Sequence, residues 1–292
     1  MAGLKEIRTR IASVKTTRQV TSAMKMVSAA KLKKAQDAIL QIRPYADKLH
    51  QILTSLSASL ENYDDSVFTH PRIPGNILII LISSNRGLCG GFNTNISKKA
   101  IELITSKYNW QLQLGHVDVI CLGKMGERQM KHKGLNITGT RNEIFDNLTF
   151  ENVSDFISEI MKTYAEGFYD RVEIVYNQFK NAAVQVQTAE QFLPVKIETG
   201  NQNETNLEFI YEPTKEEIIR DLIPRSLKIQ FYKAVLDSYA AEHGARMTAM
   251  HLATDNATEL LRELTLQYNK ERQATITGEI LEIVSGAEAL KG

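Results

Sequence analysis

The chain has 292 residues and a formal net charge of +1, with 43% hydrophobic and 24% charged residues, which is ordinary for a soluble protein of one or two domains with a real core. No apolar run approaches 18 residues, so a membrane-spanning helix is excluded. The two cysteines, Cys89 and Cys121, have neither metal-ligand nor CxxC spacing, which predicts free buried thiols in a reducing compartment.

A single heptad frame runs through the first sixty residues and turns polar in its middle. Sustained a/d spacing predicts a coiled-coil helix, about 85 Å long at 1.5 Å per residue. A compact chain of this size is only about 50 Å across, so the helix is expected to project and to be covered by something else. The frame consists of Leu4, Ile7, Ile11, Val14, Arg18, Thr21, Lys25, Ser28, Leu32, Ala35, Ile39, Ile42, Ala46, Leu49, Leu53, Leu56 and Leu60.

The same helix is strongly basic over its first half. No acidic residue occurs between Glu6 and Asp37, whereas eight basic residues do. A helix stabilised by its own surface pairs would interleave the two signs at i,i+4, so the counter-charges are expected on a partner. A solvated basic face and a nucleic-acid-binding arm are the alternatives, although no aromatic residue precedes Tyr45 and no DNA-reading motif is present. The basic residues are Arg8, Arg10, Lys15, Arg18, Lys25, Lys31, Lys33 and Lys34.

Two further features delimit this helix. Pro44 lies inside it and predicts a kink or break near Ile42, because proline removes one backbone hydrogen bond. Residues 61–75 are rich in Asn, Asp, Pro and Gly and are expected to form a linker. The register begins at Leu4, which leaves no room for a signal or transit peptide, so a bacterial cytosolic or processed organellar chain is expected.

Residues 75–205 alternate predicted strands with predicted helices. Ile77–Ile82 is a continuous apolar run, as expected for a strand buried on both faces, and Val117–Leu122 is a second. This alternation predicts a Rossmann-like parallel sheet with a hairpin at its edge. Helices are expected at about 93–107, after Gly123 and at 151–165, and the two hairpin strands at 172–179 and 183–188.

A second long helix follows. After Pro224, which is well placed for a first helical turn, no proline occurs and the helical pattern continues to about Val284. Gly244 is a weak point that costs up to about 1 kcal/mol. Two helices of matching length at the two ends pair most simply as an antiparallel coiled coil with a left-handed supercoil. The predicted fold is therefore α/β: a long antiparallel coiled coil of residues 1–60 and 212–288, with a Rossmann-like α/β domain, residues 75–205, inserted between them.

Catalytic chemistry is absent from the sequence. Residues 83–93 stand where a Rossmann phosphate loop would stand but lack G-x-G-x-x-G, and no GxxxxGK occurs, so a turn that packs a strand against a helix is expected. Cys89 has no spaced histidine that argues for a dyad. His243 and His251 are eight residues apart, too far for an i,i+4 ligand pair, and are expected on the helix surface. No cofactor, metal or active site is predicted.

Several segments resemble the ATP synthase gamma subunit family, and the resemblance covers the whole length. The N-terminal helix is matched by IASVK, TSAMKMV and AAKL, and the first-strand turn by NRGLCGGFN. The C-terminal helix is matched by EHGARMTAM, LQYNKERQATIT and EIVSGA. These segments are residues 11–15, 21–27, 29–32, 85–93, 242–250, 266–277 and 282–287. The sequence departs from the family's usual pattern at Asn85, Gly244 and Glu271.

The resemblance implies a central rotating stalk of a proton-translocating ATP synthase. Such a stalk couples rotation of the proteolipid ring to conformational change, and so to ATP synthesis or hydrolysis, at the catalytic beta subunits. The chain itself would be non-catalytic. The implied partners are a hexamer of alpha and beta subunits around the coiled coil, the epsilon subunit and the proteolipid c-ring, with no nucleic acid. Membrane association would be peripheral, through the complex, at the cytoplasmic face of the bacterial inner membrane.

The same resemblance assigns contact residues. Tyr211 and Glu212 match the segment that faces the proteolipid ring. Contacts to the alpha and beta subunits are implied for Met24, Lys25, Arg246, Arg272, Gln273 and Thr277.

The alternative function is a coiled-coil scaffold or nucleic-acid-binding protein with a non-catalytic α/β insert. Salt-sensitive DNA affinity would reveal a nucleic-acid-binding protein. A small-molecule enzyme on the α/β domain is a further alternative.

Overall fold

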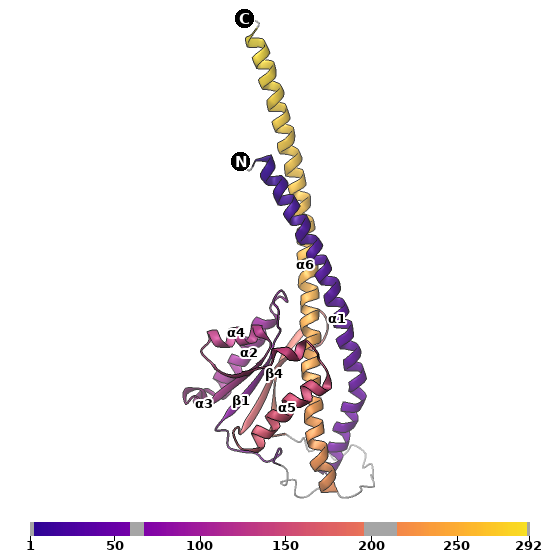
Figure 1. Cartoon of the computed structure of the whole chain (residues 1–292), viewed down its shortest axis with the longest axis vertical. Coiled ribbons are helices and arrows are strands. Elements are labelled where there is room, and N and C mark those ends of the chain that lie inside the picture. The colour runs from indigo at the N-terminus through magenta and orange to yellow at the C-terminus, as the bar shows by residue number, and fades with distance from the viewer. Residues whose placement is uncertain (1–2, 59–66, 196–214, 291–292) are drawn as a thin grey trace. The chain divides into compact units, whose positions relative to one another are not determined.

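The computed structural model describes residues 3–58, 67–195 and 215–290 (Figure 1). The chain divides into two compact units: unit 1 combines Met1–Ser28 with Met247–Gly292, and unit 2 is Ala29–Arg246. Helix α1 (Leu4–Ala58) and helix α6 (Lys215–Ala289) each contribute one segment to each unit. The two long helices predicted from the sequence are therefore present, one on either side of an α/β core in the chain order.

Helix α1 follows the predicted heptad frame. Every frame position whose side chain is described is buried or half-buried, and these include the polar Thr21 and Ser28. A single covered stripe at this spacing confirms the predicted coiled-coil helix. The side chains of Leu53 and Leu56, and Leu60 itself, lie outside the described residues.

Pro44 does not end this helix. Of the kink or break expected near Ile42, the break does not occur, because helix α1 continues through the proline. The frame residue Ile39 before the proline and Leu49 after it both lie on the covered stripe. Packing along the stripe on both sides outweighs the one hydrogen bond that proline removes, because most helical stability in proteins comes from tertiary packing.

Pro224 does not lie in the first turn of helix α6. Pro224 was expected in the first turn, but the helix starts at Lys215 and the proline lies inside it. Ile223, Leu227 and Phe231 are at most 3% exposed and belong to the core of unit 2. Packing of this segment, rather than local propensity, sets where the helix begins.

Unit 2 is built on a five-stranded sheet with the order β3-β2-β1-β4-β5. Strands β1 (Ile77–Ile82), β2 (Val117–Leu122), β3 (Asn136–Thr140) and β4 (Arg171–Phe179) are parallel, and β5 (Gln185–Leu193) pairs antiparallel with β4 at the edge. All six residues of the central strand β1 are buried, as its apolar run predicted. The Rossmann-like sheet with an edge hairpin is confirmed. Strand β3 was not predicted, and β5 extends five residues past the expected end.

Helices cover both faces of this sheet. Helix α2 (Phe92–Lys107) and α4 (Lys124–His132) pack on one face, with the short α3 (Asn109–Gln113) after α2. Helix α5 (Phe150–Ala165) and the first part of α6 pack on the other, and a 3-10 helix, Asn142–Phe145, precedes α5 (Figure 1). Because α6 supplies core residues, residues 75–205 do not contain the whole core of the sheet domain. No helix in the described ranges combines the length and the apolarity needed to cross a membrane.

Candidate functional site

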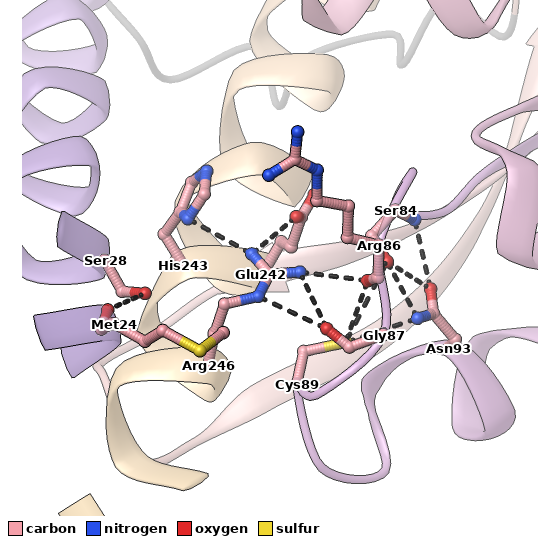
Figure 2. Close-up of polar contacts among 10 residues, drawn as sticks. All are labelled: Met24, Ser28, Ser84, Arg86, Gly87, Cys89, Asn93, Glu242, His243 and Arg246. Carbon is pink, nitrogen blue, oxygen red and sulfur yellow. Dashed lines mark hydrogen bonds and ion pairs between the residues drawn. The ribbon is translucent and has the colours of Figure 1, made fainter. Parts of the chain in front are cut away.

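In unit 1 the ends of α1 and α6 pair antiparallel. The Thr254 hydroxyl donates to Oγ1 of Thr21 over 2.8 Å, and Lys25 Nζ lies 3.4 Å from Nδ1 of His251. Residue numbers thus rise along α1 as they fall along α6, which confirms the predicted antiparallel coiled coil. The Ser28 hydroxyl donates back to the carbonyl of Met24 at 2.8 Å (Figure 2), so the hydroxyls of the frame residues Thr21 and Ser28 both have hydrogen-bond partners.

The basic stretch of α1 forms no salt bridge within the described chain, and the only described carboxyl whose pKa one of its charges shifts is that of Glu242, which burial raises and Lys31 lowers. None of its eight Lys and Arg side chains makes a salt bridge to a described carboxylate, although Lys25 contacts His251. An exposed helix that carries one sign of charge repels itself, and no described carboxylate compensates this one by direct pairing. The stretch therefore offers its positive charge outward.

Beyond the paired segment, α6 exposes apolar side chains. In the register set by Thr21 and Thr254, the start of α1 at Leu4 falls opposite about residue 271, so α1 has no residue to place against the helix after that point. Ile276, Ile280 and Ile283, predicted as apolar seam residues, are 47%, 56% and 71% exposed. The residues that the structure describes leave these three seam side chains exposed.

The predicted contact residues of unit 1 lie on these two helix segments. Met24 and Lys25 are half-buried on α1. Arg272, Gln273 and Thr277 are exposed on α6, and Arg272 makes no hydrogen bond or ion pair with any described residue. Tyr211 and Glu212 lie outside the described residues.

Arg246 has a different environment, inside unit 2. Its side chain is 7% exposed, and Nη1 lies 2.7 Å from Oε1 of Glu242, which is also 7% exposed. Nη2 donates to the carbonyl of Arg86 at 3.0 Å and to that of Gly87 at 3.3 Å (Figure 2). Arg246 was predicted to contact partner subunits, but its guanidinium forms intramolecular hydrogen bonds that connect α6 to the loop after β1.

His243 belongs to the same network, so its predicted place on the helix surface is wrong. It is 5% exposed, its ring packs edge-on against Tyr239, and Nδ1 lies 3.3 Å from Nη1 of Arg246. Burial, together with the charges of Arg246 and Lys31, lowers the pKa of the imidazole from 6.5 to about 3. The ring is therefore neutral at physiological pH. Helical spacing did not reveal its burial, because spacing along α6 does not show that Tyr239 and Arg246 pack around the ring or that the charge of Lys31 on α1 is felt there.

Gly244, between these residues, marks a close approach of the backbone. A Cβ at this position would lie 3.2 Å from Cα of Ala182 in the turn between β4 and β5, and 3.4 Å from the Phe179 ring. The glycine that was expected to weaken the helix instead lets α6 pack closely on the hairpin. The close packing on the hairpin offsets the free energy that glycine costs in helix propensity.

The loop after β1, residues 83–91, is held in place from within as well. The Ser84 backbone N–H donates to Oδ1 of Asn93 at 3.0 Å, and Asn93 Nδ2 donates to the Cys89 sulfur at 3.2 Å. Leu88 has a φ of 62° and is 64% exposed. A leucine in the left-handed region is rare and is maintained only when its surroundings fix it, so the loop presents this side chain outward in one strained conformation.

Neither cysteine is poised for chemistry. Burial raises the pKa of the Cys89 thiol, against the opposing charge of Arg246, and raises that of Cys121 to about 12. Both thiols are buried and free, as predicted. No group of three or more His, Cys, Asp or Glu side chains in the described ranges is arranged to hold a metal ion.

Comparisons with known proteins give matches over nearly the whole chain. A family model described as ATP synthase matches residues 3–290. The ATP synthase gamma chain of Flavobacterium johnsoniae is 54% identical over the full length of both chains, and that of Cytophaga hutchinsonii is 51% identical over 99% of each. The fold matches the rotor of the Euglena gracilis mitochondrial ATP synthase with a TM-score of 0.66 and 22% identity, over 94% of this chain and 98% of that one.

Proposed function

This chain belongs to the ATP synthase gamma chain family, and we propose on that basis that it is the central rotating stalk of a proton-translocating ATP synthase. It is a non-catalytic subunit, since catalysis in this family of complexes belongs to the beta subunits. Its partners are the hexamer of alpha and beta subunits, the epsilon subunit and the proteolipid ring. The stalk couples rotation of that ring to the states of the catalytic sites.

The observation that carries this proposal is the basic stretch of α1, which forms no salt bridge to a described carboxylate and whose residues from Arg8 to Lys25 lie on the coiled coil of unit 1. Catalytic sites of identical sequence differ only if an asymmetric object contacts each of them differently. Moving a two-state site from 1:99 to 99:1 requires about 5.5 kcal/mol of differential interaction. A basic rod that turns past acidic loops supplies such a difference through charge-assisted hydrogen bonds of about 1.5–3 kcal/mol each.

We propose two kinds of contact residue for the alpha and beta subunits. Met24, Lys25, Arg272, Gln273 and Thr277 bind them directly, and Arg272 gives a bidentate bond to a carboxylate of one catalytic subunit at a time. Arg246 is 7% exposed in the chain by itself. Its contribution passes through the loop of residues 83–91, which it holds against α6.

A location follows from the same proposal. The chain has no described helix that could cross a membrane, and the relatives named above are bacterial. We propose that it lies at the cytoplasmic face of the bacterial inner membrane and associates with that membrane only through the complex. In the same complex, the segment with Tyr211 and Glu212 faces the proteolipid ring.

The experiment is reconstitution of ATP hydrolysis from the purified chain with alpha and beta subunits. Wild-type chain is expected to stimulate turnover, and Arg272→Ala to lower it about tenfold or more, because one charge-assisted bond is lost. Arg272→Lys should also impair turnover, since an ammonium does not reproduce the bidentate geometry.

The matched control is Arg262→Ala, which removes another exposed arginine from the same helix. This variant should keep turnover near wild type, and all three variants should unfold at the wild-type temperature when the chain is alone. If the Arg272→Ala assembly turned over ATP at the wild-type rate, Arg272 would not be a direct contact. If the wild-type chain failed to stimulate ATP turnover, the rotor proposal itself would be wrong.

A further inference from the structure

Unit 2 carries an exposed apolar surface at the edge where strands β1, β2 and β4 begin. Each of the segments that precede these strands presents a large apolar side chain to solvent: Ile73 before β1, Trp110 and Leu114 before β2, and Phe168 before β4. Their exposed fractions are 91%, 69%, 53% and 63%. Trp110 is the one tryptophan of the chain. Clustered exposure of this kind marks an interaction site rather than ordinary scatter.

Hydrogen bonds fix these segments to one another. Gln111 Nε2 donates to the Pro74 carbonyl at 2.9 Å, which joins α3 to the approach to β1. Oδ2 of Asp170 accepts from the backbone N–H groups of Gly75 at 3.0 Å and Asn76 at 2.8 Å, which joins the approaches to β1 and β4. The apolar side chains therefore stand on a backbone framework that is already set.

A small pocket lies at the same edge of the sheet and is lined by one of these apolar side chains, Phe168. Its volume is about 230 Å³, and Phe168, Asn76, His116, Asp118, Thr163 and Tyr169 are among its lining residues. Small-molecule pockets usually enclose roughly 300–1,000 Å³ and, in open α/β sheets, lie beyond the opposite ends of the strands. The size and position suit one inserted side chain better than a cofactor.

Asp118 places a carboxylate in this pocket. Tyr169 donates its hydroxyl to Oδ2 at 3.0 Å, and Asn136 Nδ2 donates to Oδ1 at 2.6 Å. Burial and the bond to Asp118 raise the pKa of the Tyr169 phenol to about 12, so it remains a neutral donor. No Lys, Arg or His of the described residues forms a salt bridge with Asp118. The carboxylate has neutral donors and spare lone pairs but no counter-cation.

We propose that this surface docks a loop of a partner subunit that inserts one lysine or arginine beside Asp118 and covers Trp110, Leu114 and Phe168 with flanking apolar residues. The carboxylate selects a cation, and the apolar rim excludes water from the pair, which strengthens it. An anionic lipid surface would place phosphate against this carboxylate and is disfavoured by charge. The proposal rests on the chain working within an assembly, as set out above, and concerns no residue assigned to the alpha and beta subunits.

The test is photo-cross-linking in the assembled, membrane-reconstituted complex, with a photoreactive amino acid in place of Leu114. Cross-links are expected to a subunit loop in which a Lys or Arg lies within a few residues of the linked position. In the same background, Asp118→Asn should lower the cross-link yield about tenfold or more, because it removes the charge of a buried charge-assisted bond but keeps the shape. Trp110→Ala should lower it too, through loss of the aromatic contact.

Matched controls are Asp155→Asn, an exposed carboxylate on α5, and Val186→Ala, an exposed apolar residue on β5; neither should change the yield. Each variant chain is first checked for a wild-type unfolding temperature, and if Asp118→Asn fails this check, Trp110→Ala carries the test. Cross-links to lipid, to a second copy of the chain or to a loop without a basic residue would overturn the proposal. So would a yield that neither surface variant lowers. ATP turnover of wild-type chain with alpha and beta subunits alone is measured separately, so failure of the rotor proposal is recognised independently.

Discussion

Replacement of Arg246 by alanine should destabilise the isolated chain. The substitution leaves Glu242, 7% exposed, without the guanidinium 2.7 Å from its carboxylate, and removes the donor to the Arg86 and Gly87 carbonyls. Burial already raises the pKa of the Glu242 carboxyl, and the charge of Arg246 opposes that rise. Breaking a buried ion pair from one side costs about 3–5 kcal/mol. With about 2–4 °C per kcal/mol for a domain of this size, the unfolding temperature should fall by roughly 6–20 °C.

The assay is thermal unfolding of the chain alone, followed by circular dichroism. Adding Glu242→Gln to Arg246→Ala should recover part of the loss, because the second change removes the unpaired buried charge. Arg262→Ala, on the exposed face of the same helix, serves as the control and should leave the transition in place. If Arg246→Ala unfolded at the wild-type temperature and still reduced ATP turnover in the assembly, the internal role of Arg246 would be refuted in favour of direct contact.

Two further predictions concern neighbouring positions of α6. Burial raises the pKa of the Asp237 carboxyl from 3.8 to about 6, against the charges of Lys233 and Arg43, so its ionisation destabilises the folded chain increasingly as pH rises from about 4 to 6 and fully above that. Asp237→Asn should therefore raise the free energy of unfolding at pH 8 by up to about 3 kcal/mol and by less at pH 5, as chemical denaturation at the two pH values would measure; an unchanged pH dependence would contradict this. Gly244→Ala should stay near wild-type stability, because up to about 1 kcal/mol of helix propensity offsets the tight approach to the hairpin, whereas Gly244→Val should cost about 1–3 kcal/mol. Equal stability of the two Gly244 variants in the same denaturation experiment would count against the close packing inferred there.

Local spacing alone determined much of the fold. A heptad frame places one stripe of α1 on a single face of the helix, and every position of that stripe from Ile7 to Leu49 is buried or half-buried in the structure. A six-residue apolar run such as Ile77–Ile82, which is short for a helix and follows Pro74 and Gly75, favours a strand with both faces covered, and alternation of strands and helices then favours a parallel sheet. Strand β3 was missed because its burial pattern is mostly partial and its sequence, NITGT, has no apolar run.

Residue spacing does not predict burial in a helix segment that is covered on all sides. Between Ala234 and Gly244 nearly every residue of α6 is buried, including His243 and Glu242, because the helix is enclosed by the sheet domain. Spacing along one helix specifies which residues share a face, but not how many faces are covered. That is why His243 was expected at the surface, and why Arg246 could not be recognised as an anchor of the loop after β1.

For the proposed contact residues too, some features could be predicted from the sequence and others depend on the tertiary structure. The sequence by itself determined that α1 is basic without interleaved acids and that Arg272 and Gln273 interrupt an apolar pattern, since both are properties of order along the chain. Only the tertiary structure decided that the described chain supplies no salt bridge to these cations and that Ile276, Ile280 and Ile283 remain uncovered. The surface around Trp110 and Asp118 depends on tertiary structure most of all. Three segments far apart in sequence meet there only because parallel strands begin at one edge of the sheet, and no periodicity within any one segment encodes that meeting.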